Sequence, residues 1–189
     1  MKNENGSIIL LNGTSSSGKS SLAKALQACL DDPYLHVDGD YFWQLYPESF
    51  FADQSDDTYR TWRNRFLPAC YQSLATFAQS GINIIIDEVL TKPATLTWLQ
   101  QALSPFEVVF VGLHCGLVEL ERREIERGDR RVGLARFQYP NIHIHGEYDI
   151  VVNTENNDSV TCALQIKELL QSGQQFVQFQ QAQEQPLPS

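Results

Sequence analysis

The sequence predicts a three-layer α/β fold built around a parallel β-sheet. Five short apolar segments alternate along the chain with segments whose apolar residues recur at helical spacing. A small, polar, glycine-flanked loop joins the first apolar segment to the first helical segment. Acidic residues follow directly after two of the other apolar segments. Because parallel strands end at the same edge of a sheet, we expect the loop and the acids to meet there.

The expected strands are short, and most of them are apolar throughout. They cover residues 7–11, 34–37, 82–86, 106–113 and 150–152. Nearly continuous apolar runs such as SIILL and INIII are typical of strands that are buried on both faces. Helices are expected between Lys19 and Asp31, near 58–79, at 93–103, and at about 116–127 and 158–171.

The composition is that of an ordinary globular protein and fits one domain. The chain has 189 residues, 42% of them hydrophobic, and a net charge of -9, which argues against nucleic acid or an anionic membrane as a partner. No segment resembles a targeting sequence or a membrane span. Four scattered cysteines without a CxxC pair disfavour zinc and indicate a reducing cytoplasm: Cys29, Cys70, Cys115 and Cys162. Residues 173–189 are rich in glutamine and proline and are expected to form a tail with partial order.

The loop after the first strand matches a phosphate-binding pattern. Residues 13–20 read GTSSSGKS, which satisfies the G-x-x-x-x-G-K-[ST] motif of a P-loop. The alternative is a serine-rich surface turn, but the strand before the motif and the helix after it favour a loop that binds the phosphates of ATP. Lys19 is expected to reach the β- and γ-phosphates, and Ser20 to bind Mg²⁺. The predicted nucleotide-binding residues here are Gly13, Thr14, Ser15, Ser16, Ser17, Gly18, Lys19, Ser20 and Ser21.

Two pairs of acids stand at strand ends. Asp87 has the position of a Walker B carboxylate and is predicted to hold the Mg²⁺ shell, although a capping or loop acid is the alternative. Glu88 either shares that role or faces the second substrate. Asp38 and Asp40 follow the second strand, where a carboxylate can orient an acceptor hydroxyl and accept its proton. The alternative for this pair is capping of a helix that begins at Tyr41.

An unusually arginine-rich segment follows the fourth strand. Residues 121–136 read ERREIERGDRRVGLAR. Arginines four residues apart on a helix repel each other unless an anion lies between them, so a lid that closes over ATP is one interpretation. The alternative is a solvated helix face on which neighbouring glutamates pair with the arginines. The arginines in question are Arg122, Arg123, Arg127, Arg130, Arg131 and Arg136.

Several segments together resemble the chloramphenicol 3-O-phosphotransferase family of P-loop kinases. These segments are IILLNGTSSSGKSSLAKALQ, HVDGDYFWQLYP, INIIIDEV, HCGLVELERREIERGDRRVG and HGEYDIVVNT, within about residues 7–170. The resemblance implies ATP, magnesium, a sheet of strand order 2-3-1-4-5 and a helical lid. It further implies that Asp40 activates the acceptor hydroxyl and that Arg123, Arg127 and Arg130 bind the nucleotide.

The resemblance also divides the chain into functional parts. Residues 1–172 would form a single P-loop kinase domain, with a lid at about 116–140 and an acceptor-pocket region at about 40–80. The aromatic and acidic stretch 41–66 departs most from the family pattern. An aromatic-lined pocket suits a planar small molecule, but aromatic residues suit ordinary core packing equally well, so the substrate stays open at this point.

The function that the sequence favours is ATP-dependent phosphorylation of a small-molecule hydroxyl. Lys19 and Asp40 are the predicted catalytic residues, and Asp38, Asp40 and Glu88 are predicted to face the substrate. A nucleoside or nucleotide kinase is an alternative, for which Arg60, Arg63 and Arg65 would bind an acceptor phosphate. The spacing of Asp38 and Asp40 also resembles the Asp-x-Asp of shikimate kinases. A nucleotide-dependent switch, the non-kinase alternative, would need no acceptor acid.

Overall fold

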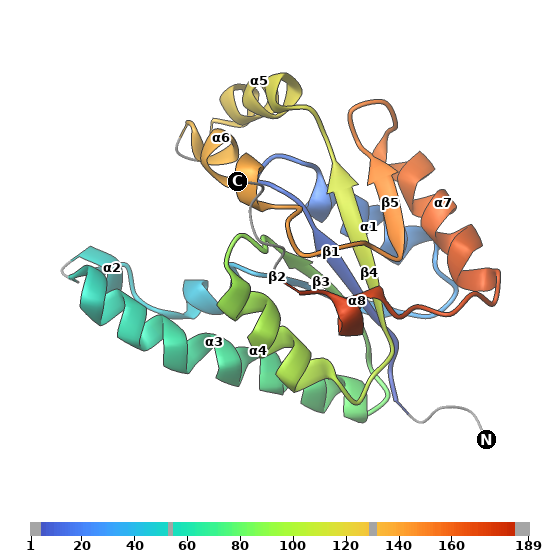
Figure 1. Cartoon of the computed structure of the whole chain (residues 1–189), viewed down its shortest axis with the longest axis horizontal. Coiled ribbons are helices and arrows are strands. Elements are labelled where there is room, and N and C mark those ends of the chain that lie inside the picture. Colours follow the sequence, from blue (N-terminus) through green and yellow to red (C-terminus); the bar gives the residue numbers. More distant parts are fainter. Residues whose placement is uncertain (1–4, 53–54, 129–131, 184–189) are drawn as a thin grey trace.

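A five-stranded parallel sheet forms the centre of the computed structural model, which describes residues 5–52, 55–128 and 132–183. The strands are β1 (Ile8–Asn12), β2 (Tyr34–Asp38), β3 (Asn83–Glu88), β4 (Val108–His114) and β5 (Ile150–Asn153). Their order across the sheet is β2-β3-β1-β4-β5 (Figure 1). The predicted fold class and strand order are confirmed.

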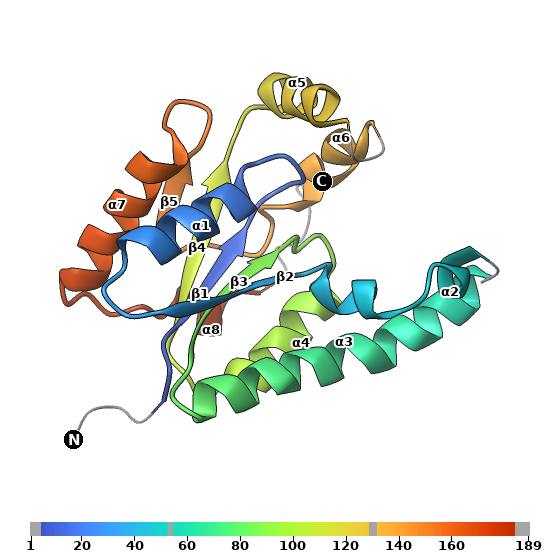
Figure 2. The same ribbon diagram turned by 180° about the vertical axis from the view of Figure 1, so that it is seen from behind.

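Helices cover both faces of the sheet, as Figures 1 and 2 show from opposite sides. One face is covered by α1 (Lys19–Cys29) and α7 (Ser159–Gln171), and the other by α3 (Asp56–Gln79) and α4 (Pro93–Leu103). Side chains alternate along β1: Ile8 and Leu10 pack with the α3 and α4 side, whereas Ile9 and Leu11 pack with the α1 and α7 side. All four are fully buried, which explains the continuous apolar run in the sequence.

Short elements lie at the carboxyl ends of the strands. After β2 come η1 (Tyr41–Leu45) and α2 (Ser49–Ala52), and after β4 come α5 (Leu117–Arg127), α6 (Leu134–Gln138) and η2 (Tyr139–Asn141). Figure 1 places α5 and α6 together above the strand ends, and α2 with the start of α3 farthest from the sheet. None of the helices in the described ranges is both long and apolar enough to cross a bilayer.

The segment after α7 packs back onto the domain, a role that its composition did not predict. The short helix α8 (Gln178–Gln181) lies against β4, and its Phe179 is fully buried in the core on the α3 and α4 side (Figure 1). Gln100 donates hydrogen bonds to the carbonyls of Phe179 and Ala182 at 2.8 and 2.9 Å. A single aromatic side chain thus anchors a glutamine-rich segment, and a composition average cannot reveal one such residue.

Candidate active site

The P-loop backbone adopts conformations that only a few residue types tolerate. A Cβ atom at Gly13 would lie 2.6 Å from the Ser17 hydroxyl and 3.2 Å from the Leu113 carbonyl oxygen, so a larger residue would force the loop to shift. Gly18, the residue before α1, has φ 90° and has no side chain that could accept a hydrogen bond from the first N–H groups of the helix. Ser16 also has a positive φ of 63°, a strain of roughly 1 kcal/mol or more that is typical of functional loops. The N–H groups at the start of α1 are therefore available to an anion.

Polar side chains around the loop are arranged for a phosphate and a cation. The Lys19 ammonium donates to the carbonyls of Gly13 and Thr14, each at 2.9 Å, and lies 3.7 Å from the Asp87 carboxylate. Ser20 donates its hydroxyl to Asp87 at 2.7 Å, which joins the two predicted magnesium ligands. Three buried hydroxyls of the loop have no hydrogen-bond partner among the described residues: those of Ser15, Ser16 and Ser17. This donor set fits a triphosphate with its bound Mg²⁺.

The register of the sheet brings the predicted acids together at the carboxyl edge. Asp87 on β3 lies opposite Asp38 on β2 and Leu11 on β1, and Glu88 lies opposite Asn12. The Asp40 N–H donates to the Asp38 carboxylate at 2.7 Å, so Asp38 holds the turn after β2. Asp40 is the first residue before η1, but its side chain makes no capping hydrogen bond to that helix.

Asp87 is a buried carboxylate with a favourable electrostatic environment. Burial raises its pKa, but the neighbouring His36 ring, the positive charge of Lys19 and the hydrogen bond from Ser20 more than compensate, so the pKa lies below its usual value. The His36 Nε2 atom lies 3.6 Å from the carboxylate. Asp87 is therefore ionised at neutral pH, as a magnesium-binding carboxylate must be.

Glu88 is a buried carboxyl of a different kind. Burial raises its pKa to about 7, with a smaller contribution from the charges of Asp87 and Asp40, and hydrogen bonds from Tyr71 and Val89 offset only part of this. The Tyr71 hydroxyl donates to it at 2.8 Å, and the Val89 N–H at 3.1 Å. A Cβ atom at Gly39 would lie 2.9 Å from this carboxyl, so the glycine between the two aspartates makes room for Glu88.

Two cavities meet at the P-loop. The first, of about 370 Å³, extends from the loop to Asp38, Asp40, Glu88 and residues of α3 and α4. The second, of about 520 Å³, extends from the loop to α5 and to the segment between β5 and α7. Both are lined by Ser16, Gly18, Ser20, Ser21 and Arg127. Two molecules, one in each cavity, would therefore contact each other across the P-loop.

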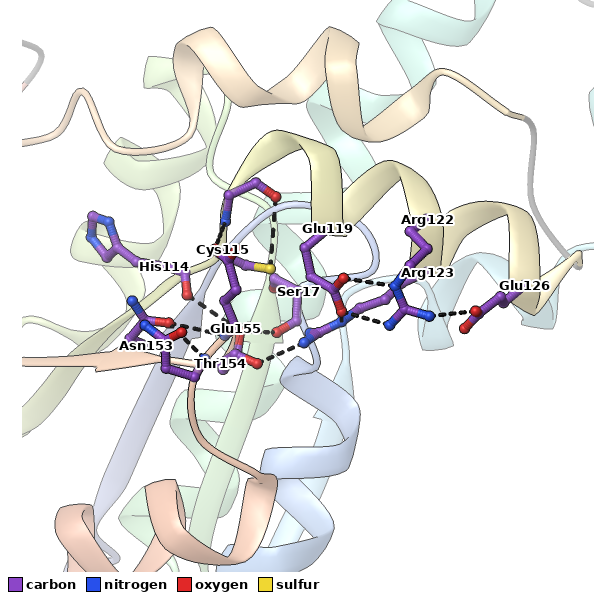
Figure 3. A network of polar contacts seen from close by, with 12 residues as sticks. Ser17, His114, Cys115, Glu119, Arg122, Arg123, Glu126, Asn153, Thr154 and Glu155 are labelled. Carbon is purple, nitrogen blue, oxygen red and sulfur yellow. Dashed lines mark hydrogen bonds and ion pairs between the residues drawn. The ribbon is translucent and has the colours of Figure 1, made fainter.

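The lid arginines fall into two groups. Arg122 and Arg136 are exposed and pair with glutamates, as the solvated-face alternative expects. Arg123 and Arg127 line the second cavity. Arg123 donates to the Glu119 carboxylate and to the Thr154 carbonyl, both at 2.7 Å (Figure 3), and its Nη1 lies 4.0 Å from the site of a Cβ at Gly18. Arg130, which was also predicted to bind nucleotide, and Arg131 lie outside the described residues.

The P-loop is contacted both by the segment after β5 and by the lid. Figure 3 shows Thr154, whose hydroxyl donates to the Ser17 carbonyl at 2.8 Å, next to the guanidinium of Arg123. From α6, the Gln138 side-chain oxygen accepts a 2.6 Å hydrogen bond from the Ser15 N–H. That oxygen occupies a position at which a phosphate oxygen could accept the same bond.

The sequence did not predict the role of Asn12, which lies directly before the P-loop, or of the residues that contact it. Asn12 at the end of β1 is fully buried, and its side chain donates to Tyr148 and to the Ile142 carbonyl and accepts from the Leu90 N–H. The Tyr148 ring fills the space where a Cβ at Gly112 would stand. The one available signal was an asparagine directly before the first P-loop glycine, since a buried amide demands partners.

This P-loop, with carboxylates at the ends of two neighbouring strands and two cavities that meet at it, defines a P-loop kinase. Solved structures support the fold. The Mycobacterium tuberculosis APS kinase CysC, in complex with AMPPNP and APS, superposes with a TM-score of 0.67 at 16% identity, covering 90% of this chain and 100% of that one. The Deinococcus radiodurans tunicamycin resistance protein gives a TM-score of 0.65 at 18% identity, covering 87% and 95%.

The chain belongs to the chloramphenicol phosphotransferase-like protein family, whose model matches residues 6–171. It is 34% identical over 172 residues to a Mycobacterium tuberculosis H37Rv protein named "Putative O-phosphotransferase Rv2636", a match that covers 79% of this chain and 75% of the relative. The resemblance inferred from the sequence is thus confirmed, and the protein is a phosphotransferase of the kinase class that binds a nucleotide.

Proposed function

We propose that the protein transfers the γ-phosphate of ATP to a hydroxyl group of a small molecule. The observation that carries this proposal is the pair of cavities that meet at the P-loop, one of them with Asp40 in its wall. A nucleotide in the second cavity would place its terminal phosphate at the shared wall. An acceptor in the first cavity would then lie in line with that phosphate, which is the arrangement that phosphoryl transfer requires.

The nucleotide side of the site binds the phosphates and neutralises their negative charge. The loop N–H groups and the start of α1 bind the phosphates, and Lys19 exchanges its contacts with the Gly13 and Thr14 carbonyls for the β- and γ-phosphates. Ser20 and Asp87 would hold Mg²⁺, and the ion would supply positive charge to the phosphates. Arg123 and Arg127 contact the nucleotide from the lid, and we assign Arg130 the same role on the resemblance alone.

The acceptor half orients the nucleophile. Asp40 accepts a hydrogen bond from the acceptor hydroxyl, aligns its oxygen with the γ-phosphorus and takes the proton as the new P–O bond forms and the bond to the β-phosphate oxygen breaks. Asp38 fixes the turn that carries Asp40, and Glu88 faces the acceptor from the floor of the cavity. Trp43, Leu67 and Tyr71 supply its apolar walls.

The acceptor cavity disfavours a nucleotide as the second substrate. Of the three arginines that a nucleoside monophosphate would require, Arg60 pairs with Asp57 and Arg65 is exposed. Only Arg63 lines the cavity. A shikimate-type acceptor needs fewer cations and stays an alternative within the same reaction class.

The test is an ATP-consumption screen with Mg²⁺ against chloramphenicol, shikimate, nucleosides and nucleoside monophosphates. We expect one acceptor class to raise turnover above hydrolysis by water, and Asp40→Asn to lower this gain by about 100-fold or more. Asp31→Asn is the charge-matched control, because Asp31 is exposed and lines neither cavity. Acceptor-dependent turnover that survives Asp40→Asn would contradict the mechanism, and hydrolysis without any acceptor effect would favour a nucleotide-dependent switch.

The cellular setting that we propose is the cytoplasm. Its supports are the demand for ATP and the four cysteines, all of which are free thiols.

A further inference from the structure

Arg63 occupies an unusual position in the acceptor cavity. It comes from the first third of α3 and lines the same cavity as the strand-end acids. One of its terminal nitrogens donates to the buried Thr95 hydroxyl at 2.7 Å, and its guanidinium carbon lies 5.1 Å from the centre of the Trp98 ring. Both partners belong to α4. The contacts hold the guanidinium in one place without neutralising its charge.

Among the arginines that the structure describes, Arg63 is partly buried without a carboxylate partner, whereas Arg65, which also lacks one, is exposed. Arg60, Arg122, Arg123 and Arg136 each pair with a carboxylate, although the chain carries an excess of negative charge. Arg63 pairs with no carboxylate in residues 5–52, 55–128 or 132–183. A half-buried guanidinium in an acidic protein gains most from an anionic partner, and here the open side of the group faces the cavity.

Acidic and basic side chains line the same cavity from different elements. Asp38, Asp40 and Glu88 line the cavity from the sheet edge, and Arg63 lines it from α3. The pKa of Lys92, at the start of α4, is lowered mainly by partial burial of its own side chain. The positive charge of the neighbouring Arg63 lowers it further. An acceptor in this cavity therefore meets both carboxylates and, on the α3 side, the positive charge of Arg63.

We propose that Arg63 binds an acidic group of the acceptor, so that the substrate is a hydroxyl compound that also carries a carboxylate or a phosphate. The hydroxyl lies at Asp40, and the acidic group receives two charge-assisted hydrogen bonds from the free edge of the guanidinium. The position of the hydroxyl rests on the proposed function. The anion subsite rests only on Arg63, Thr95 and Trp98.

Equilibrium binding tests the subsite without any need for catalysis. Mg²⁺ and AMPPNP are first added to saturation, so that the P-loop is not open to the probes. Calorimetry then compares three acid and neutral pairs: gluconate with glucitol, shikimate with its methyl ester, and glycerol 3-phosphate with glycerol. The variants are Arg63→Gln, Arg63→Lys and the matched control Arg65→Gln, which removes the same charge from an exposed position two residues further along α3.

We expect at least one acidic probe to bind at least ten-fold more tightly than its neutral partner. Whether this probe is a carboxylate or a phosphate identifies the acidic group that Arg63 prefers. Arg63→Gln should abolish this difference, Arg63→Lys should keep part of it, and Arg65→Gln should leave it unchanged. Equal binding of acidic and neutral probes, no binding of any acidic probe, or an acid preference that survives Arg63→Gln would each overturn the inference. A probe that binds through Arg63 but is not phosphorylated by ATP would instead count against the proposed function.

Discussion

The two halves of the site are built in different ways. On the nucleotide side, the residues of the phosphate cradle are nearly consecutive in the chain, and strand β1, a tight loop and α1 fix their positions. On the acceptor side, Asp40, Arg63 and Glu88 come from three distant segments that meet only because β2, β3 and α3 pack together. The phosphate cradle is therefore a local property of the sequence, whereas the acceptor cavity is a property of the whole fold.

The difference extends to burial. Lys19, Ser15 and Ser17 are buried, and the Thr154 hydroxyl holds the loop through the Ser17 carbonyl. The aromatic residues beyond Trp43, by contrast, pack on one another near the start of α3 with much of their surface exposed: Phe51 is 44% exposed and Trp62 43%. A phosphate site that binds the same chemical group can be rigid and formed by neighbouring residues. An acceptor site can vary in its wall residues without any change in the P-loop.

The strongest test of the nucleotide half is Lys19→Met. The charge that stabilises the transferring phosphate is lost, and we expect the rate of phosphoryl transfer to fall by about 1,000-fold or more, with the fold intact. The measurement is kcat with saturating ATP and acceptor. Lys167→Met is a charge-matched control, since Lys167 on α7 pairs with Asp31, which follows α1, and neither residue lines a cavity. An active Lys19→Met enzyme would show that the P-loop does not carry the chemistry.

The acceptor half depends on the core beneath it, and Phe179→Ala tests this dependence. Phe179 is fully buried together with Leu67, Tyr71 and Leu90, which lie on the acceptor side of the sheet. Loss of the ring should lower the free energy of unfolding by about 3–5 kcal/mol, measured by urea denaturation. Phe176→Ala, a change in the same segment at a partly exposed ring on the opposite face, should cost clearly less. Equal costs would mean that α8 does not anchor the acceptor side.

The same contrast explains how much the sequence could predict. The strands, their order and the P-loop follow from local patterns and from the family resemblance, and the strand-end positions of Asp38 and Asp87 follow from parallel topology. The pinning of Arg63 by α4 and the anchoring of α8 by Phe179 could not be predicted, because each depends on contacts between residues more than thirty positions apart. For Arg123 the sequence indicated a lid but not its attachment to Thr154.

The raised pKa of Glu88 makes the stability of the acceptor side depend on pH. A glutamate in the unfolded chain titrates near 4.5, and in the folded protein near 7, so the folded state holds the proton more tightly. The resulting stabilisation is fully present below pH 4.5 and is lost as the pH rises to 7, in total about 3 kcal/mol. The lowered pKa of Asp87 acts in the opposite sense, but only at lower pH.

Glu88→Gln should therefore remove this pH dependence. We expect the stability of the wild-type protein, relative to the variant, to fall between pH 4.5 and 7 and then to stay constant. Melting temperatures of both proteins across this range measure the change, and Asp40→Asn, which removes an acid from the same cavity, serves as the comparison. If the melting temperatures of the wild type and Glu88→Gln change in parallel with pH, Glu88 has an ordinary pKa. Water would then reach the Glu88 side of the acceptor cavity more freely than its burial indicates.

The smallest expected effect distinguishes two adjacent arginines of the lid. Arg123 is partly buried and joins α5 to the Thr154 carbonyl at the nucleotide cavity (Figure 3). Arg122 is 54% exposed, and its ion pairs within the described part of the chain are with Glu119 and Glu126 on its own helix. Arg123→Ala should raise the KM for ATP by about ten-fold and leave the KM for the acceptor unchanged. Arg122→Ala should change neither value, because exposed ion pairs of this kind contribute little. If both variants raise the KM for ATP equally, the whole charged face of α5 binds the nucleotide; if Arg123→Ala changes only the acceptor KM, the two cavities have been assigned the wrong way round.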